Sequence, residues 1–286
     1  METEEMLGIS AFIITMAVLV SASVSDWRKR EISDTHWMAL GVIGLIMLAS
    51  YSVHLTGFRW EYACLAAGTA MILLDIFWEK EFNPLLFYPL LALLFIVPLY
   101  GNMQEDVFRA WASVPLCYLI FLGMYVLGIV RGGADAKCLI VLSVMFPFYP
   151  RFFGAPLIGV PDPVGQIFVF SVSVLFIAAM AAIPAVAYFV ARNAREGGFS
   201  KKMFSGYRMP VSQAENAHVW PLEDIVDGEP FAIKIPKEDE IADIYLRLKE
   251  AGHEAVWVTP MIPFVIMITA ATAAVALIGN PLFLIF

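Results

Sequence analysis

The chain has 286 residues, of which 60% are hydrophobic and 15% charged, and its mean hydropathy is +0.76. Soluble globular domains are about 45–50% apolar and about 25% charged, so the composition excludes an ordinary soluble domain and indicates a polytopic membrane protein. The net charge of −8 gives no support to nucleic-acid binding. The three cysteines lie in or beside apolar segments, without the spacing of a metal site: Cys64, Cys117 and Cys138.

A helix that crosses the hydrocarbon core needs about 20 apolar residues, and by this criterion the sequence predicts about eight spans. The first follows METEE and lacks both a basic region and a small-residue cleavage site, so we interpret it as a retained helix and not as a signal peptide. The predicted spans cover approximately 7–25, 37–55, 61–77, 84–100, 108–130, 136–150, 164–190 and 260–285.

The predicted fold is therefore an all-α polytopic membrane bundle with one polar insertion. Residues 1–190 form the bundle, and 260–286 add a C-terminal transmembrane helix that completes it. Residues 191–259 are predicted to form a small cytoplasmic α/β domain of the strand–helix–strand type. In it, PFAIKIP and HEAVWVTP show the alternation of strands, and KEDEIADIYLRLKEAG between them has a helical period that ends at Gly252.

Basic residues predict the orientation of this bundle. With the N-terminus outside, only Arg59, Arg109 and Arg151 of the 18 lysines and arginines fall on the outer side. Long polar domains cross membranes largely regardless of charge, so we discount the basic residues of 234–249. The other lysines and arginines still lie mostly on the inner side, which favours this orientation. It brings the segments 26–36 and 131–135 to the cytoplasmic face.

Two aspartates on that face are the candidate catalytic residues. Asp26 follows the small residues of SASVS at the end of the first span, and Asp135 follows Gly132 and Gly133 just before the sixth. Each has a structural alternative, since Asp26 suits a helix end paired with a neighbouring arginine and Asp135 suits a helix cap. Because two acids are predicted at one face, we favour a carboxylate pair that shares a proton and activates water.

Other ionisable residues fit this chemistry less well. Asp75 is predicted to face the membrane interface or to pair with Lys80, and Asp34 to support the first basic loop by charge pairing. The four histidines are scattered and predict no metal site. No GxSxG context supports a serine nucleophile.

Three segments together resemble the archaeal preflagellin and prepilin peptidases. SDWRKREISDTHW resembles their first catalytic segment, and RGGADAKCL resembles the second, a G-x-hydrophobic-Asp variant of the GxGD signature. AVWVTPMIPFV resembles the stretch that leads into their last helix. The motifs occur in the family's order and at matching positions in the predicted topology.

The resemblance implies an aspartic membrane protease without a cofactor, which removes short basic leader peptides from preflagellin or type IV prepilin-like precursors on the cytoplasmic side. Carried over by motif, Asp26 and Asp135 are the catalytic pair. Gly132, Gly133 and Ala134 shape the second segment, and Lys137 belongs to it without an assigned role. Expected partners are the precursors and membrane lipid, with no nucleic acid; the oligomeric state stays open.

Two features depart from the family pattern. The compact archaeal members have six spans, so the surplus of the predicted eight would lie between the two motifs, near 61–100. The paired cysteines and methyltransferase motif of bacterial relatives are absent, so methyl transfer is not expected.

Two alternatives remain open at this point. A presenilin-like or signal-peptide-peptidase-like protease also uses a GxGD aspartate, but the chain has neither the YD nor the PAL motif of those enzymes. An ion-coupled or proton-coupled transporter would use acids as relays, but no acid is predicted near the bilayer midplane.

Overall fold

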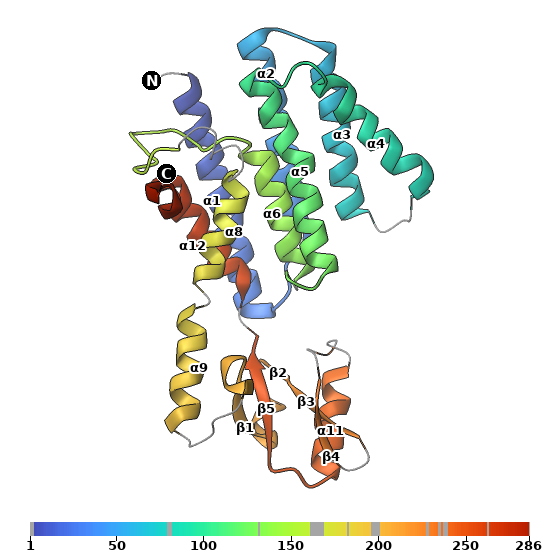
Figure 1. Ribbon diagram of the computed structural model, residues 1–286, viewed down its shortest axis with the longest axis vertical. Helices are drawn as coiled ribbons and strands as arrows, with labels where there is room; N and C mark the ends of the chain where they lie inside the picture. The colour runs from blue at the N-terminus through green and yellow to red at the C-terminus, as the bar shows by residue number, and fades with distance from the viewer. Residues whose placement is uncertain are drawn as a thin grey trace. The chain divides into compact units, whose positions relative to one another are not determined.

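The computed structural model describes residues 3–78, 82–130, 132–160, 169–181, 183–195, 201–226, 229–233, 236, 240–261 and 263–285 (Figure 1). The chain divides into two compact units. Unit 1 comprises Met1–Ala178 and Pro263–Phe286, and unit 2 comprises Ala179–Ile262.

Unit 1 is a helical bundle. Four of its helices are long and apolar enough to cross a membrane: α1 (Thr3–Lys29), α2 (Asp34–Thr56), α3 (Trp60–Phe77) and α5 (Asp106–Val126). Three shorter apolar helices are α4 (Pro84–Leu99), α8 (Phe170–Met180) and α12 (Phe264–Leu277). Among the described residues, the other helices of the unit are α6 (Gly133–Met145) and the short η3 (Pro281–Ile285).

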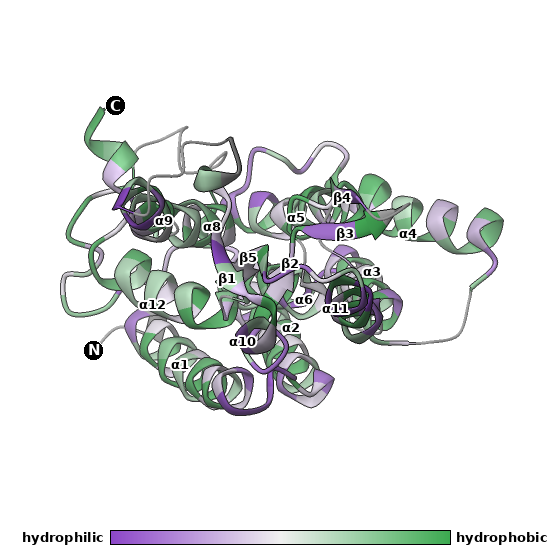
Figure 2. Cartoon of the chain, turned by 90° about the horizontal axis from the view of Figure 1, so that it is seen from below, coloured by the Kyte–Doolittle hydropathy of each residue, from purple (hydrophilic) through white to green (hydrophobic). Residues whose placement is uncertain are grey.

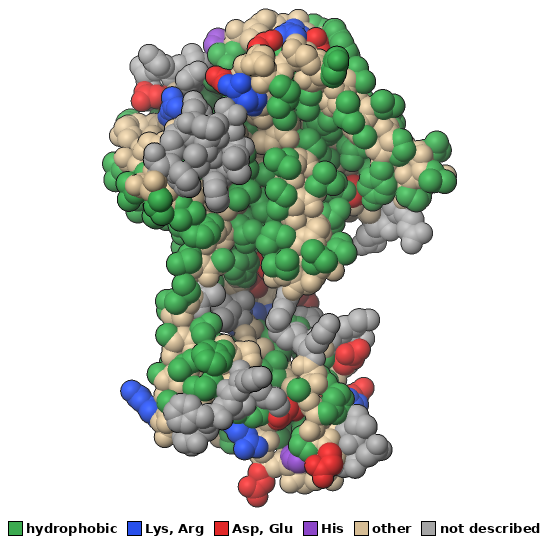
Figure 3. Space-filling model, in the orientation of Figure 1, with side chains coloured by type: hydrophobic (Ala, Val, Ile, Leu, Met, Phe, Trp, Pro, Cys, Tyr) green, Lys and Arg blue, Asp and Glu red, His purple; other side chains and the backbone are tan. Residues whose placement is uncertain are grey.

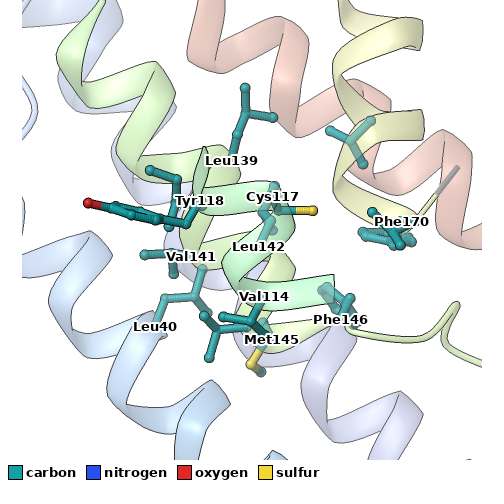
Figure 4. Packing of buried hydrophobic residues seen from close by; sticks show 14 of the residues in the cluster. Leu40, Val114, Cys117, Tyr118, Leu139, Val141, Leu142, Met145, Phe146 and Phe170 are labelled. Carbon is teal, nitrogen blue, oxygen red and sulfur yellow. The ribbon is translucent and has the colours of Figure 1, made fainter. Parts of the chain in front are cut away.

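The short helix α6 lies at the centre of unit 1. Every residue from Cys138 to Met145 is buried, which is the pattern of a helix covered on all sides. Its side chains interdigitate with Leu40 of α2 and with Val114 and Cys117 of α5 (Figure 4). At Gly44 of α2 an added Cβ would stand 3.0 Å from the Met145 backbone, so α2 and α6 pack backbone to backbone.

The predicted count of about eight spans is not confirmed. The sixth predicted span, 136–150, is helical only to Met145, because Pro147 and Pro150 interrupt the segment. The seventh, 164–190, corresponds to α8 and to α9 (Ile183–Arg195) of unit 2, and 161–168 lie outside the described residues. The last helix begins only at Phe264, because a strand extends to Pro260.

Unit 2 combines short strands with helices. Its sheet has the antiparallel order β1 (Tyr207–Pro210), β5 (Ala255–Pro260), β2 (Val219–Pro221), and a separate hairpin pairs β3 (Glu223–Val226) with β4 (Glu229–Ala232). The helices in the described part of this unit are α9, η1 (Lys201–Phe204), α10 (Val211–Ala214) and α11 (Ile241–Glu250). Unit 2 carries most of the hydrophilic colour in Figure 2, and the visible face of unit 1 in Figure 3 is mainly hydrophobic.

The predicted strand–helix–strand order is present as β4, α11 and β5, but β4 pairs with β3 and not with β5. Helix α11 ends as the sequence indicates: Gly252 has φ +75°, and its N–H donates to the Lys249 carbonyl. Ile244 and Leu248 of α11 pack with Val256 and Val258 of β5 in the core of this unit.

Candidate functional site

Asp26 lies near the end of α1, on the face that the helix turns toward the bundle. Thr15, Leu19 and Ala22 are fully buried, and Asp26 continues this row one turn after Ala22. The carboxylate itself is half-buried. The row of buried residues therefore directs Asp26 into unit 1 and not toward lipid.

The link between α1 and α2 is held by hydrogen bonds around Asp26. Ser25 donates to the Glu31 carbonyl at 2.9 Å, and the Ser33 hydroxyl caps the start of α2 by accepting from Thr35. His36 Nδ1 lies 3.1 Å from the Ser33 carbonyl, which only accepts, so Nδ1 carries the proton and Nε2 accepts from Ser21. The turn that follows Asp26 is thus fixed to both helices.

Asp135 lies in the first turn of α6, folded back against Gly132. A Cβ placed on Gly132 would stand 2.2 Å from Asp135 Oδ2, so a side chain at this position would displace the carboxylate. Gly133 is less restricted, because its nearest neighbour, the Tyr125 hydroxyl, would stand at 3.6 Å. Gly132, Gly133, Ala134 and Asp135 are all partly accessible. A substrate can therefore approach the backbone of this segment.

The two carboxylates are close enough for the charge of Asp26 to act on the Asp135 carboxyl. Within the part of the chain that the structure describes, neither makes a hydrogen bond or an ion pair through its side chain. Other aspartates of unit 1 differ in this respect: Asp34 is bound by Lys137, and Asp75 accepts from the Tyr118 hydroxyl at 2.5 Å. Among the aspartates described in this unit, Asp26 and Asp135 are the two whose side chains make no hydrogen bond or ion pair, although the charge of Arg30 also acts on Asp26.

Sequence reasoning left two partners unidentified. Lys137 Nζ lies 2.6 Å from Asp34 Oδ2, whereas the sequence assigned Lys137 no role. The partner of Asp75 is Tyr118, and the expected partner Lys80 lies outside the described residues. The sequence places the two opposite charges at the starts of apolar segments on the same predicted face, but it does not show that these segments, the second and the sixth, are neighbours in space.

An apolar groove of about 490 Å³ runs between α1 and α12 beside this end of α1. Val20, Val24 and Trp27 line it from α1, and Ala270 lines it from α12. Trp27 neighbours Asp26 in sequence, so one end of the groove lies at the level of that carboxylate. No group of three histidine, cysteine or acidic side chains is suited to hold a metal ion among the described residues.

Comparison with known proteins matches both ends of this chain. The model of the type IV leader peptidase family matches residues 13–85, which include Asp26. A second model, the archaeal peptidase A24 C-terminus type II, matches residues 200–280. Asp135 falls between the two matched regions.

Full-length relatives span the gap. A preflagellin peptidase of Methanococcus maripaludis is 27% identical over 281 residues, covering 94% of this chain and 95% of the relative. The chain is thus similar to the type IV leader peptidases in two separate regions and to preflagellin peptidases along most of its length. A preflagellin peptidase of Methanocaldococcus jannaschii is 23% identical over 96% of both chains, and an uncharacterized protein of that organism is 24% identical. No solved structure matches significantly.

These similarities support a peptidase. The apolar helices of unit 1 agree with the membrane assignment. The leader peptidase match covers the C-terminal part of α1 from residue 13, together with α2 and α3, and the C-terminal match covers most of unit 2 together with α12. The insertion between the bundle and its last helix is therefore part of what the relatives share.

Proposed function

We propose that the protein is an aspartic endopeptidase that removes short basic leader peptides from preflagellin or type IV prepilin-like precursors at the cytoplasmic membrane face. The observation that carries this proposal is the pair Asp26 and Asp135: the charge of Asp26 acts on the Asp135 carboxyl, and neither side chain is held by a hydrogen bond or an ion pair among the described residues. Relatives along the whole length of the chain are named preflagellin peptidases, which supports this substrate class.

The chemistry follows from two acids in one place. Two neighbouring carboxyls do not ionise equally, so one keeps a proton at a pH at which the other is a carboxylate. The carboxylate takes a proton from water, whose oxygen attacks the carbonyl carbon of the scissile peptide. The protonated carboxyl gives its proton to the carbonyl oxygen, and collapse of the tetrahedral intermediate transfers a proton to the leaving nitrogen. Titration belongs to the pair and not to one residue.

The surroundings of the pair suit such a substrate. Gly132, Gly133 and Ala134 form an accessible backbone segment beside Asp135. The groove along α1 and α12 presents an apolar surface that ends near Asp26. A precursor has a polar cut site followed by a hydrophobic stretch. The cut site would lie at the two carboxylates, and the hydrophobic stretch would lie along the apolar groove.

The test is cleavage of candidate precursors by purified protein in detergent, followed by N-terminal mapping of the products. We expect Asp26→Asn and Asp135→Asn each to lower the cleavage rate by at least about 10³-fold, since each removes a group that transfers a proton. Asp106→Asn is the control, because Asp106 is an exposed acid that begins α5 and should be dispensable.

Full activity in either catalytic variant would disprove the dyad. A cut inside the hydrophobic stretch would instead indicate an intramembrane protease of the presenilin kind. Because detergent removes any ion gradient, cleavage under these conditions also distinguishes a peptidase from a transporter.

A further inference from the structure

The start of α6, which carries Asp135, has little local support. Its N-cap is Gly132, which has no side chain to bind the free N–H groups of the first turn, and Gly133 follows. Helix α2, by contrast, begins with a Ser33 cap. Since glycines allow many backbone conformations, the chain before α6 does not fix how the helix is rotated about its axis.

Lys137 supplies the missing support. Its ammonium group lies 2.6 Å from Asp34 Oδ2 in the first turn of α2, and 5.6 Å from the ring centre of Phe77 in the last turn of α3. One side chain in the first turn of α6 thus contacts the ends of two other helices. The ion pair is partly shielded, with 27% of the Lys137 side chain and 43% of the Asp34 side chain exposed.

Successive residues of an α-helix are about 100° apart around its axis, so Asp135 and Lys137 leave α6 about 200° apart. The two side chains therefore point to nearly opposite sides of the helix. Lys137 points toward α2 and α3, and Asp135 lies where the charge of Asp26 acts on it. Fixing Lys137 consequently fixes the direction in which Asp135 points.

We propose that the Lys137–Asp34 ion pair is a positioning clamp that sets the rotation of α6 and so aims Asp135 at Asp26. The inference rests on the proposed function and deepens it. Lys137 and Asp34 are positioning residues, because they act through Asp135 and not on the substrate. A misplacement of about 1 Å in a catalytic group costs up to about 100-fold in rate, so a clamp at this place has a large effect.

The experiment compares kcat and KM for precursor cleavage in Lys137→Met, Asp34→Asn, Lys137→Arg and the exchanged pair Asp34→Lys with Lys137→Asp. We expect the two single losses to lower kcat by about 10-fold to 100-fold, with KM changed less than about twofold. Lys137→Arg keeps the charge and should retain most of the activity. The exchanged pair restores the attraction and should recover at least about tenfold over either single loss.

The matched control is the ion pair of Arg59 and Glu105. Its N–O distance is 3.0 Å and its side chains are 26% and 44% exposed, which resembles the clamp closely. Arg59 precedes α3 at the end opposite to Phe77, about 27 Å away along a helix of 18 residues. Glu105→Gln should leave kcat unchanged. That result would show that losing a partly exposed ion pair does not by itself lower kcat, so a loss of kcat in the Lys137 and Asp34 variants is specific to their pair.

A second measurement reports the position of residue 135 relative to residue 26 and does not depend on activity. Asp26→Cys and Asp135→Cys, combined in a chain whose three native cysteines are replaced by serine, should form a disulfide under mild oxidation. Adding Lys137→Met should slow this cross-linking by at least about fivefold if the clamp aims the first turn of α6.

Three results would overturn the clamp: full activity of Asp34→Asn, a rise in KM at unchanged kcat for Lys137→Met, or unchanged cross-linking. The second result would mean that Lys137 contacts the substrate. The failure of the proposed function looks different, since Asp26→Asn and Asp135→Asn would then leave cleavage intact whatever the state of Lys137.

Discussion

The candidate site requires a glycine at position 132, since the structure leaves no room there for a side chain. Its φ of −81° is open to any residue, so the requirement comes from space and not from backbone conformation. The space is taken by the Asp135 carboxylate, 2.2 Å from where a Cβ would lie. A methyl group at 132 must push the Asp135 carboxylate oxygen away or shift the first turn of α6.

We therefore expect Gly132→Ala to lower kcat by about 100-fold, because the catalytic carboxyl is displaced by about 1 Å or more. Gly133→Ala is the matched control, since its Cβ would make only an ordinary contact of 3.6 Å with Tyr125. It should stay within about threefold of the parent kcat. Equal rates in the two variants would show that Asp135 works from a position other than the one described.

In unit 2, strand β3 and helix α11 are joined by two hydrogen bonds between one pair of side chains. Arg247 Nε donates to Asp224 Oδ1 at 2.9 Å, and Nη2 donates to Oδ2 at 2.7 Å. These hydrogen bonds hold the pKa of Asp224 below its usual value. A lowered pKa in the folded state means that the contact stabilises unit 2 above about pH 4 and is lost as the pH falls through the pKa of the folded state.

Asp224→Asn should thus destabilise unit 2 by about 1 kcal/mol at pH 7, and the difference should shrink as the pH falls below about 4. Limited proteolysis of the whole protein, with thermolysin at neutral pH and pepsin at acid pH, measures both conditions. A destabilisation of the same size at both pH values would mean that the ionised carboxylate is not the stabilising group.

The same elements show how far the sequence predicts the fold. Helix α11 and strand β5 are predictable because their periods persist over many residues and Gly252 marks a helix end. The strands β1, β2 and β3 were missed because each has only three or four residues, and the partners of β1 and β2 lie far away in the sequence. For α6, hydrophobicity predicts a span to residue 150, whereas prolines end the helix at Met145.

For the candidate site, residue types and topology lead to Asp26, Asp135 and the glycines before the latter. The Lys137–Asp34 contact could not be predicted from spacing, because a topology count places residues at a membrane face without fixing the rotation of each helix. Rotation depends on packing, such as the close approach of α2 and α6 at Gly44.

For the whole molecule, the distribution of basic residues predicts that the N-terminus is outside and unit 2 cytoplasmic. Gln104 precedes α5 on the predicted outer side, and Glu250 ends α11. In a chain with Cys64 replaced by serine, Gln104→Cys should react with a membrane-impermeant maleimide on intact cells. Glu250→Cys should react only after the cells are permeabilised. The reverse pattern would place the carboxylates on the outer face.

The packing of unit 1 has a mechanical consequence. Helix α1 packs most extensively on α12, whereas α6 packs most extensively on α2 and then on α5. Asp26 and Asp135 therefore lie in different groups of packed helices, so a shift of α1 and α12 relative to α2, α5 and α6 would change the distance between the two carboxylates. On the proposed function, a compound that held these two groups of helices apart should lower cleavage without contacting either carboxylate, and its inhibition should be noncompetitive with short leader peptides.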